Sequence, residues 1–515
     1  MTQSRRDFIK FVVAGSVLAG CPVDESLFAV PEAAPGASPD VHGEQFEICH
    51  KIRDGFQYPR PAARRRTDVV IVGGGVAGLS AAYFLRKVDF LLLEKEDHFG
   101  GNAYQEEYGG QAFATGSAFA FRGDYGDQLS RELGLTLLPV NNPDPTILQG
   151  AWIPDTWRAG LDALPYSRDV RNSFKKFRDS LLKIDLQSRS EELDQEPFSK
   201  YTAGFAPEVQ RWWNTYGPSN WGAVTSETSA YVGIESLQDI AGDRPDGRVI
   251  LPGGLGCITH KLVEVLRPQY NERMLGGATI VAVVQEEKEV RVTYSHRGQL
   301  TTVAAKAVLF CAPKFIASRI VTGIPYEQKL AMRRIRYAPY PVVNLIFDQP
   351  VYNRGYDTWC PGKAFTDFIV ADWTVRNHPG YQQKHNILTF YTPLPESQRK
   401  TLLAVNDCQK LAARVLADFQ ALLPEFKTDP VEARIYRRGH PMFKSTPGTF
   451  TKTIPAARAP MKRIFFGNAD SGGPESLTSE AIRLSRAGAE WAERVLAGQP
   501  LAREFAEKAL AAHSF

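Results

Sequence analysis

Two short apolar runs flank a glycine-rich turn and a helical pattern in the first fifth of the chain. The first run, Val69–Val72, is too short for a helix and rich in β-branched residues, which predicts a buried strand. A glycine-rich segment, 73–78, follows at once, and an Ala- and Leu-rich helical pattern continues to about Lys87. The second run, Phe90–Leu93, ends at Glu94. This order of strand, glycine turn, helix, strand and acid predicts a βαβ unit.

The glycines have the spacing GxGxxG, which is typical of a loop that binds the pyrophosphate of a dinucleotide. Gly73 allows the tight turn, Gly75 lets a pyrophosphate approach the backbone, and Gly78 lets helix and strand pack closely. The helix N-terminus presents unpaired N–H groups and its positive dipole end to the phosphates. Glu94 lies 21 residues after Gly73, where a carboxylate can accept both ribose hydroxyls. The residues predicted at this site are Gly73, Gly75, Val76, Ala77, Gly78 and Glu94.

Apolar runs further along the chain predict additional strands, separated by turns and helices. Near the middle of the chain they are Ala278–Val284, Glu289–Tyr294 and Ala307–Pro313. A second region has predicted strands at Val342–Phe347, Phe368–Val370 and Asn386–Tyr391 and a helix at Thr401–Leu422. Before both regions, residues beyond Phe121 are mostly helical and aromatic in pattern, which indicates aromatic packing inside a helical domain more than a substrate box. The aromatic residues are Trp152, Trp157, Trp212, Trp213, Tyr216 and Trp221.

The segment after Glu94 indicates which dinucleotide is expected. Gly100-Gly101-Asn102 follows the acid after a short spacer. It resembles the segment by which the flavin amine oxidase and phytoene desaturase superfamily continues its FAD site. Simple nicotinamide dehydrogenases lack this Gly-Gly step. The resemblance implies that Glu94, Lys95, Gly100, Gly101 and Asn102 contact FAD.

The end of the chain resembles the last FAD-contacting motif of the same superfamily. An apolar run, Ile464–Phe466, leads into a loop rich in Gly and Ser and then into a helix from about Leu477. Asp470 falls at the acidic position, where the family's carboxylate holds a ribityl hydroxyl. Leu477 and Thr478 open the helix whose positive end would face the flavin N1–C2=O edge and stabilise the anionic reduced flavin. FAD is therefore the expected cofactor.

Two further segments are similar to parts of the superfamily's cofactor site. Gly116 and Ser117 belong to a segment that passes along the flavin, and the backbone near Ile280 contacts the adenine side. The implied fold is α/β, with a Rossmann-like FAD-binding domain and an α+β substrate domain. The FAD-binding domain has a parallel sheet with helices on both faces plus a small antiparallel layer.

The domain organisation expected from these motifs is discontinuous, because the cofactor segments lie far apart in the sequence. The FAD-binding domain is assigned to residues 67–120, 245–320 and 455–500, and the substrate domain to 121–244 and 321–454. Residues 1–21 are interpreted as a signal, and 22–66 as a tether followed by an arm that packs on the first domain.

The N-terminus resembles an export signal. Ser4-Arg5-Arg6 begins a twin-arginine pattern, and Leu18-Ala19-Gly20-Cys21 matches a bacterial lipobox, so Cys21 is the expected lipidation site. The apolar stretch between these motifs is too short and interrupted for a transmembrane helix. We therefore expect a periplasmic protein that is exported in folded form and attached to the membrane only through a lipid anchor.

Composition narrows the choice of partners. With 515 residues and 43% hydrophobic residues, the chain can bury two substantial cores. Its formal charge of +4 falls to +2 once the signal is removed, because three basic residues and one acid lie in it. That value is too near neutral to indicate nucleic acid. The six cysteines contain no C-x-x-C pair, and Cys49-His50 has no further ligands at metal spacing, so neither a disulfide framework nor a metal site is expected.

The amine-oxidising members of the superfamily place a lysine near flavin N5, two aromatic walls around the amine and, in monoamine oxidases, a covalent cysteine. All three features look altered here. Val342, after Pro341, occupies the lysine position, His440 lies near the cysteine position, and Pro441 and Leu477 replace the walls. His440 is the one catalytic candidate, as an acid or base or as a covalent flavin ligand, although a structural role is the commoner one. Arg437 and Arg438 are interpreted as a solvated charge run rather than as a carboxylate-binding site.

The leading interpretation is an FAD-dependent oxidoreductase that transfers a hydride from a C–N bond of a small amine-like substrate to flavin N5. Oxygen or a respiratory partner would accept the electrons. One alternative is a desaturase or isomerase that acts on a C–C bond, as in the phytoene desaturase branch. Another is a lipoprotein whose FAD serves a redox partner without turnover of its own.

Overall fold

The structure is a computed structural model that describes residues 39–242, 247–426 and 428–499. All of these residues belong to one compact unit, residues 37–515. The predicted twin-arginine motif and Cys21 lie outside the described residues. Within the described part, no helix is both long enough and apolar enough to cross a membrane.

The first sheet is the predicted dinucleotide-binding sheet. Its strand order is β11 (Met274–Leu275), β3 (Phe90–Leu93), β2 (Arg65–Val72), β14 (Gln299–Phe310), β13 (Val290–His296), β12 (Ala278–Gln285) and β15 (Val321–Thr322), with β23 (Ile464–Phe466) paired to β14. The β2, β3 and β23 pairings are parallel, whereas β12, β13 and β14 form an antiparallel layer. These are the two kinds of layer expected from the sequence, and the α/β fold is confirmed.

β14 joins the three sequence segments of this sheet. Its first half pairs with β13, and its second half pairs with β2 from Val303↔Arg65 to Phe310↔Val72. Its last residues, Val308 to Phe310, also pair with β23. One long strand therefore holds together the beginning, the middle and the end of the chain.

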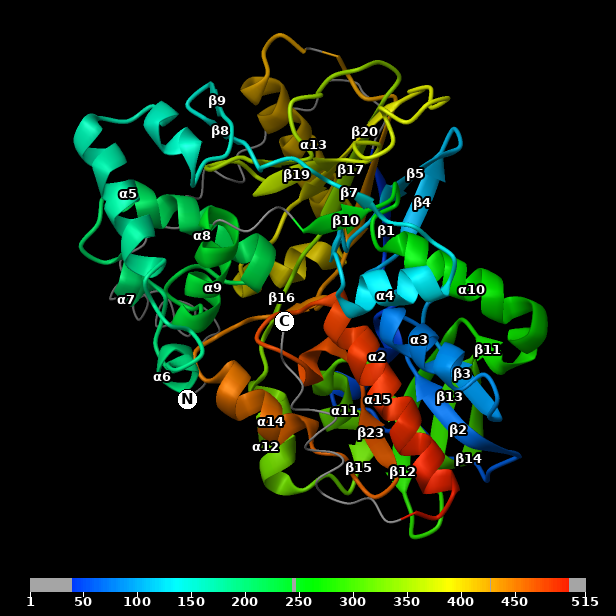
Figure 1. Ribbon diagram of the computed structural model, residues 1–515. Coiled ribbons are helices and arrows are strands. Elements are labelled where there is room, and N and C mark those ends of the chain that lie inside the picture. The colour runs from blue at the N-terminus through cyan, green and yellow to red at the C-terminus, as the bar shows by residue number, and fades with distance from the viewer. Residues whose placement is uncertain (1–38, 243–246, 427, 500–515) are drawn as a thin grey trace, which may run out of the picture. The chain divides into compact units, whose positions relative to one another are not determined.

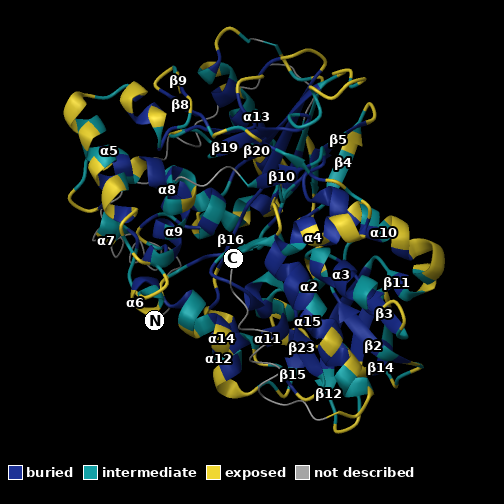
Figure 2. Cartoon of the chain, in the orientation of Figure 1, coloured by how far each residue is buried: buried dark blue, intermediate teal, exposed yellow. Residues whose placement is uncertain are grey.

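Helices cover both faces of the first sheet. One face carries α3 (Val76–Phe84), α4 (Tyr125–Glu132), α10 (Gly256–Tyr270) and α15 (Thr478–Leu496), which bury one apolar core with the sheet. The other face carries α11 (Lys314–Ile320), α12 (Tyr326–Arg334) and α14 (Ile454–Arg458). Figure 1 shows α15 in red beside the blue α3, and Figure 2 shows how completely the adjoining strands are buried.

The second sheet contains strands from the N-terminal arm and from both substrate-domain segments. Its order is β1 (Asp40–Gly43), β21 (Glu432–Arg437), β17 (Val342–Phe347), β20 (Asn386–Tyr391), β19 (Asp367–Val370), β18 (Asp357–Trp359), β8 (Thr146–Leu148) and β9 (Ala151–Ile153). α13 (Val405–Leu422) packs on one face through a core of Phe and Leu side chains. The opposite face is lined by tyrosines and faces the cofactor segments.

A segment of helices follows β9 in the sequence. It contains α5 (Arg168–Leu181), α6 (Ser190–Asp194), α7 (Ser199–Thr202), α8 (Pro207–Trp221) and α9 (Ala230–Ala241). Its core contains most of the aromatic residues noted in the sequence, namely Trp157, Trp212, Trp213, Tyr216 and Trp221. Aromatic packing is therefore the correct interpretation for these five, whereas Trp152 is partly exposed.

Small elements complete the fold. β10 (Arg248–Ile250) pairs with β6 (Ala120–Phe121) and β7 (Leu138–Pro139), β4 (Gln105–Tyr108) with β5 (Gln111–Ala114), and β16 (Tyr337–Ala338) with β22 (Met442–Phe443). The remaining helices are α2 (Glu47–Arg53) and the single turns Ala159–Ala163, Asn271–Arg273, Glu396–Leu403, Thr449–Thr453 and Ala469–Ser471.

Two expected boundaries differ from the structure. The cofactor-side layer does not end at residue 320, because β15 pairs with β12 and α12 packs on the same core. The arm does not pack on the first domain alone, because β1 pairs in parallel with β21 of the second sheet. The sequence of β1 is polar and only four residues long, so its pairing depends on the neighbouring strand rather than on its own pattern.

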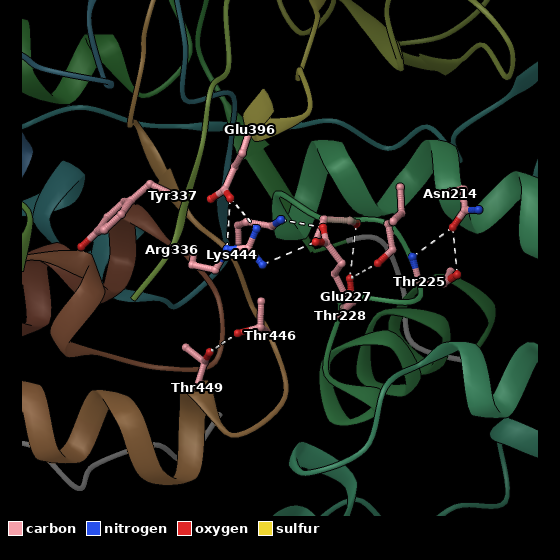
Figure 3. A network of polar contacts seen from close by, with 12 residues as sticks. Asn214, Thr225, Glu227, Thr228, Arg336, Tyr337, Glu396, Lys444, Thr446 and Thr449 are labelled. Carbon is pink, nitrogen blue, oxygen red and sulfur yellow. Dashed lines mark hydrogen bonds and ion pairs between the residues drawn. The ribbon is translucent and has the colours of Figure 1, made fainter. Parts of the chain in front are cut away.

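A network of ion pairs joins the loop between α8 and α9 to the residues that flank β16 and β22. Arg336 lies between Glu396 and Glu227, and Lys444 binds Glu227 at 2.6 Å (Figure 3). The Lys444 side chain is 4% exposed. Burial raises the pKa of Glu227, but the nearby Lys444 and Arg336 cations outweigh burial and hold it below its ordinary value.

We predict that Glu227→Gln lowers the free energy of unfolding by about 1–2 kcal/mol at neutral pH, because it leaves the buried Lys444 cation without a carboxylate. Since the pKa of Glu227 is lowered on folding, this contribution is present above its unfolded pKa and is lost as the pH falls through its folded pKa. Chemical denaturation at two pH values measures both effects. Glu192→Gln, in an exposed pair with Arg189, is the control and should change the free energy of unfolding less than Glu227→Gln does.

Candidate functional site

A cavity of about 1160 Å³ lies between the carboxyl ends of the first sheet and the tyrosine-lined face of the second. Most of the predicted cofactor residues border it. They are Gly73, Gly75, Val76, Ala77, Glu94, Lys95, Gly101, Asn102, Gly116, Ser117, Ile280, Asp470, Leu477 and Thr478, and His440 borders it too. The structure thus brings together segments that are almost 400 residues apart in the sequence. Gly78 and Gly100 do not border the cavity.

The glycine loop has the conformation that its spacing predicts. Gly73 has φ of +98°, a region that favours glycine. A Cβ atom on Gly78 would lie 1.7 Å from the Gly73 carbonyl oxygen, so Gly78 permits the close packing of loop and helix. A Cβ atom on Gly75 would meet nothing closer than the Gly101 Cα, at 3.7 Å. Gly75 therefore leaves open space toward the cavity rather than toward the protein.

The N-termini of two helices lie at the cavity, and neither has a side-chain cap. α3 begins after Gly75 and α15 begins after Leu477, and neither N-cap residue accepts a hydrogen bond through its side chain. The first N–H groups of a helix have no partner within the helix, so each end offers donors and a positive dipole to an anion. This donor set fits the diphosphate of FAD at α3 and a flavin that becomes anionic at α15.

Gly100 supports the loop from behind. Its N–H donates to the Gly74 carbonyl at 2.9 Å, and Gly75 and Gly100 form a parallel bridge. The neighbouring Asn102 donates through its side chain to the Pro441 carbonyl at 2.7 Å, which links the cofactor loop to the second lobe. The predicted Gly-Gly-Asn segment is therefore a structural brace on one side and a cavity wall on the other.

Glu94 is buried at the end of β3. Its carboxylate accepts the Gly74 N–H at 2.5 Å and the Glu96 N–H at 2.9 Å. Burial raises the pKa of Glu94, although both N–H donors and the Lys95 charge oppose this effect. These bonds fix the carboxylate at the cavity, where the predicted ribose hydroxyls would lie.

Lys95 also borders the cavity and is surrounded by acids. It contacts Glu96, which in turn accepts the Gln45 N–H from the N-terminal arm at 3.0 Å. Burial lowers the pKa of Lys95, but the Glu44, Glu96 and Glu94 carboxylates outweigh it, so the pKa lies above its ordinary value. The arm thus helps to complete the adenosine end of the site.

Near Ile280, the ladder between β12 and β13 is interrupted. The register shifts between Ile280 and Ala282, so Val281 has no partner on the opposite strand. Such a bulge re-aims the local backbone. This backbone is the part of the chain that was expected to face the adenine.

Asp470 has partners that the sequence did not reveal. Its carboxylate binds the Lys314 ammonium at 2.7 Å and accepts the Lys314 N–H and the Tyr337 hydroxyl, each at 2.6 Å. Lys314 is fully buried, and burial lowers its pKa against the opposing effect of Asp470. Both carboxylate oxygens are therefore anchored before any ribityl hydroxyl binds. Lys314 follows Pro313 at the start of α11, separated by three residues from the end of β14, and nothing in its spacing from Asp470 predicted this pair.

The segment at Gly116 and Ser117 is held in place by the second lobe. The Ser117 N–H donates to the Asn102 carbonyl at 3.0 Å, and the Tyr391 hydroxyl donates to the Gly116 carbonyl at 2.8 Å. Arg438 donates to the carbonyl and the hydroxyl oxygen of Thr115. Arg438 is buried, so the interpretation as a solvated charge run is wrong for this residue.

The substrate side of the cavity has aromatic walls at positions that the sequence analysis missed. Tyr391 and Trp359 border it from β20 and β18 of the second sheet, and Tyr340 borders it from the loop just before β17. The Tyr340 and Tyr391 rings meet edge to face with centroids 5.9 Å apart. Tyr391 is the register partner of Val342, the residue at the expected lysine position. Strand pairing, which a single sequence does not show, brings these residues together.

His440 borders the cavity with its ring packed against Phe315, centroids 4.7 Å apart. Burial, with the Arg399 charge beside it, lowers the pKa of His440 to about 3. The imidazole is therefore neutral at neutral pH and does not act there as a cationic acid. Among the described residues, no group of His, Cys, Asp and Glu is arranged to hold a metal ion, and the five cysteines from Cys49 onward are free.

Comparison with known proteins identifies the family. The family described as flavin containing amine oxidoreductase matches residues 76–490. This chain belongs to that family. FAD is accordingly its cofactor, and the family and cofactor predictions are confirmed.

Individual relatives are more distant. The chain is 26% identical over 273 residues to the oxidoreductase PigB of Serratia sp. (strain ATCC 39006), which covers 50% of this chain and 39% of that protein. It is 40% identical over 78 residues to amine oxidase [flavin-containing] A of Canis lupus familiaris, covering 14% and 15% of the two chains. The matches span less than half the length of these curated relatives.

Solved structures share the fold. A double mutant of putrescine oxidase has a TM-score of 0.65 at 16% identity, with 84% of this chain and 99% of that chain covered. Cyclohexylamine oxidase from Brevibacterium oxydans IH-35A has a TM-score of 0.65 at 17% identity, with the same coverage. At these identities the similarity establishes the architecture alone.

We predict that Gly75→Ala and Gly78→Ala separate cofactor binding from folding. Gly75→Ala should leave the stability of the FAD-free protein within about 0.5 kcal/mol of wild type but weaken FAD binding by roughly tenfold or more, which is about 1.4 kcal/mol. Gly78→Ala should destabilise the FAD-free protein by about 2 kcal/mol or more, because its methyl group overlaps the Gly73 carbonyl. Denaturant unfolding and FAD fluorescence titration measure the two effects. Equal loss of stability in both variants would contradict the assignment of Gly75 to the cofactor.

Proposed function

We propose that this chain is an FAD-dependent oxidoreductase that removes a hydride from the C–N bond of a small amine-like substrate. The observation that carries this proposal is that the residues predicted to bind FAD border the same cavity as Tyr340, Tyr391 and Trp359. The family match to amine oxidoreductases supports an amine as the substrate class.

Bound FAD supplies the acceptor for the hydride. The residues of the chain bind and orient the cofactor and the substrate and supply the electrostatic field around them. The uncapped ends of α3 and α15 would hold the diphosphate and the flavin edge, Glu94 the ribose, and Asp470 the ribityl chain. Tyr340 and Tyr391 orient the substrate, and the buried walls of both sheets exclude water around it. Oxygen or a respiratory partner takes up the electrons.

The cavity wall differs from that of the amine oxidases in one respect that bears on mechanism. Val342 is 1% exposed and lies where a lysine is expected to hold a water. The hydroxyls of Tyr340 and Tyr391 are bonded to Ser219 and to the Gly116 carbonyl, respectively. The chain therefore positions its substrate with tyrosine rings and fixed hydroxyls, without a lysine at that point.

The most direct functional experiment is an anaerobic titration of the FAD-loaded protein, from Pro22 onward, with a panel of amines and a panel of C–C desaturation substrates. Bleaching of the flavin absorbance by amines supports the proposal. Bleaching only by the second panel would favour a desaturase or isomerase. Stable flavin absorbance with every compound would favour a redox carrier that serves a partner.

For His440, we predict no contribution to the pH dependence of activity. Because burial lowers its pKa to about 3, it stays neutral throughout the range of about pH 5 to 8 in which histidines usually titrate. His440→Asn should therefore keep the shape of the kcat/KM profile over this range, whatever happens to its height. Loss of a limb of the profile in the variant would assign His440 to acid–base chemistry. Flavin colour that stays with acid-precipitated wild type, but not with the variant, would assign it to a covalent bond.

We also propose export through the twin-arginine route and anchoring by a lipid on Cys21. This rests on Arg5-Arg6 and on the lipobox that ends at Cys21. A protein that must fold around FAD before export suits a route that carries folded chains. Replacing Arg5 and Arg6 with lysine should retain the protein in the cytoplasm, and Cys21→Ser should release it from the membrane fraction. Unchanged fractionation of both variants would contradict the proposal.

A further inference from the structure

Two aspartates border the cavity from neighbouring strands of the second sheet. Asp357 on β18 and Asp367 on β19 are 5% and 2% exposed. Asp357 is the register partner of Ile369 and Asp367 that of Trp359, so the two aspartates lie two positions apart on one face of the β18–β19 ladder. Asp367 is the register partner of Tyr391, whose hydroxyl binds the Gly116 carbonyl on the flavin segment. The acids therefore belong to the substrate side of the cavity.

Neither aspartate has a cation of its own. No ion pair joins either of them to a Lys or Arg anywhere in the described residues. Arg248, the nearby cation, is already bound to Asp144 at 2.7 Å and to the Asn142 carbonyl at 2.9 Å. The Oδ1 atom of Asp357 is buried and has no hydrogen-bond partner in the structure, whereas Asp367 accepts from Thr366. A buried carboxylate oxygen that lines a cavity and lacks a partner is a vacant acceptor.

The protonation of the pair follows from burial and mutual repulsion. Burial, reinforced by Asp367 and Asp144, raises the pKa of Asp357 well above its ordinary range. Burial raises the pKa of Asp367 to about 7. Two carboxyl groups so placed share one proton, because both cannot ionise in so dry a place. The titratable and charged groups around them are Asp144, Arg248, Tyr340, Cys360, Lys363 and Tyr391.

A cation that enters the cavity can take the place of the shared proton. The amine nitrogen that is oxidised must be neutral at the moment of hydride loss, because its lone pair stabilises the developing C=N bond. A pair of carboxylates would hold that nitrogen protonated and unreactive. The pair is therefore suited to a different cationic group of the same substrate.

We propose that Asp357 and Asp367 bind a second, non-reacting ammonium group, so that the substrates are diamines or longer aminoalkyl amines. This inference rests on the proposed amine oxidation, but the binding experiment that tests it does not require turnover. The second ammonium replaces the proton that the two aspartates share, and that proton leaves to solvent. The aromatic wall of Tyr340, Tyr391 and Trp359 covers the alkyl chain between the two nitrogens.

The test is equilibrium binding to the FAD-loaded protein under anaerobic conditions. The probes are α,ω-diaminoalkanes of three to six carbons and the monoamines of the same lengths, measured by calorimetry in two buffers of different ionisation enthalpy. We expect the best diamine to bind roughly tenfold or more tightly than its monoamine and to release a proton on binding. Asp357→Asn and Asp367→Asn should reduce this preference to about twofold or less. Asp162→Asn, on the surface, is the control and should retain it.

The wild-type protein alone provides a second measurement if either variant fails to fold. Lowering the pH below about 7 protonates the pair further, so diamine affinity should fall, by up to roughly tenfold per pH unit. Because a monoamine lacks the second ammonium, the ratio of diamine to monoamine affinity should fall over the same pH range. Equal affinities for diamines and monoamines, no binding of either, or a preference that persists in both variants would overturn the inference. Tight diamine binding without flavin bleaching would uphold the binding site while contradicting the proposed oxidation.

Discussion

The architecture depends on the pairing of β14 with strands from three distant parts of the chain. β2, β13 and β23 all hydrogen-bond to it, so the glycine loop after β2 and the loop after β23 emerge at the same edge of the sheet. Carboxyl ends of parallel strands are where open α/β sheets bind ligands. Without this one strand, Gly75 and Asp470 would have no reason to border the same cavity, and the cofactor site would not exist.

Charge is distributed in the site according to what each end must bind. The predicted phosphate end presents uncapped backbone N–H groups of α3, and the predicted flavin end presents those of α15. Lys314 is a fully buried cation beside the loop after β23, and its ammonium binds the Asp470 carboxylate and the Ser471 hydroxyl. On the opposite side of the cavity, acidic groups outnumber basic ones, because Asp357 and Asp367 form no ion pair in the described residues and the nearby Arg248 is paired with Asp144.

Local motifs were predictable from the sequence, whereas contacts between strands were not. Gly73, Gly78 and Glu94 belong to one βαβ unit, whose chemistry depends on spacing along the chain, and they lie where the spacing predicts. Tyr340, Tyr391 and the two aspartates come together only because β17, β20, β19 and β18 pair in that order. The expected boundary at residue 320 was misplaced because β15 is only two residues long. It pairs with residues of β12 that lie 38 positions earlier in the sequence. The neutrality of His440 follows from burial, which no pattern in the sequence reports.

We propose that segments from both ends of the chain hold FAD in the cavity between the two sheets. A crystal structure of the FAD-loaded protein measures this directly. We expect the diphosphate at the N-terminus of α3, the ribityl chain beside Asp470 and the flavin ring between the start of α15 and the wall of Tyr340 and Tyr391. Electron density for FAD elsewhere, or a flavin ring separated from that wall by protein, would contradict it.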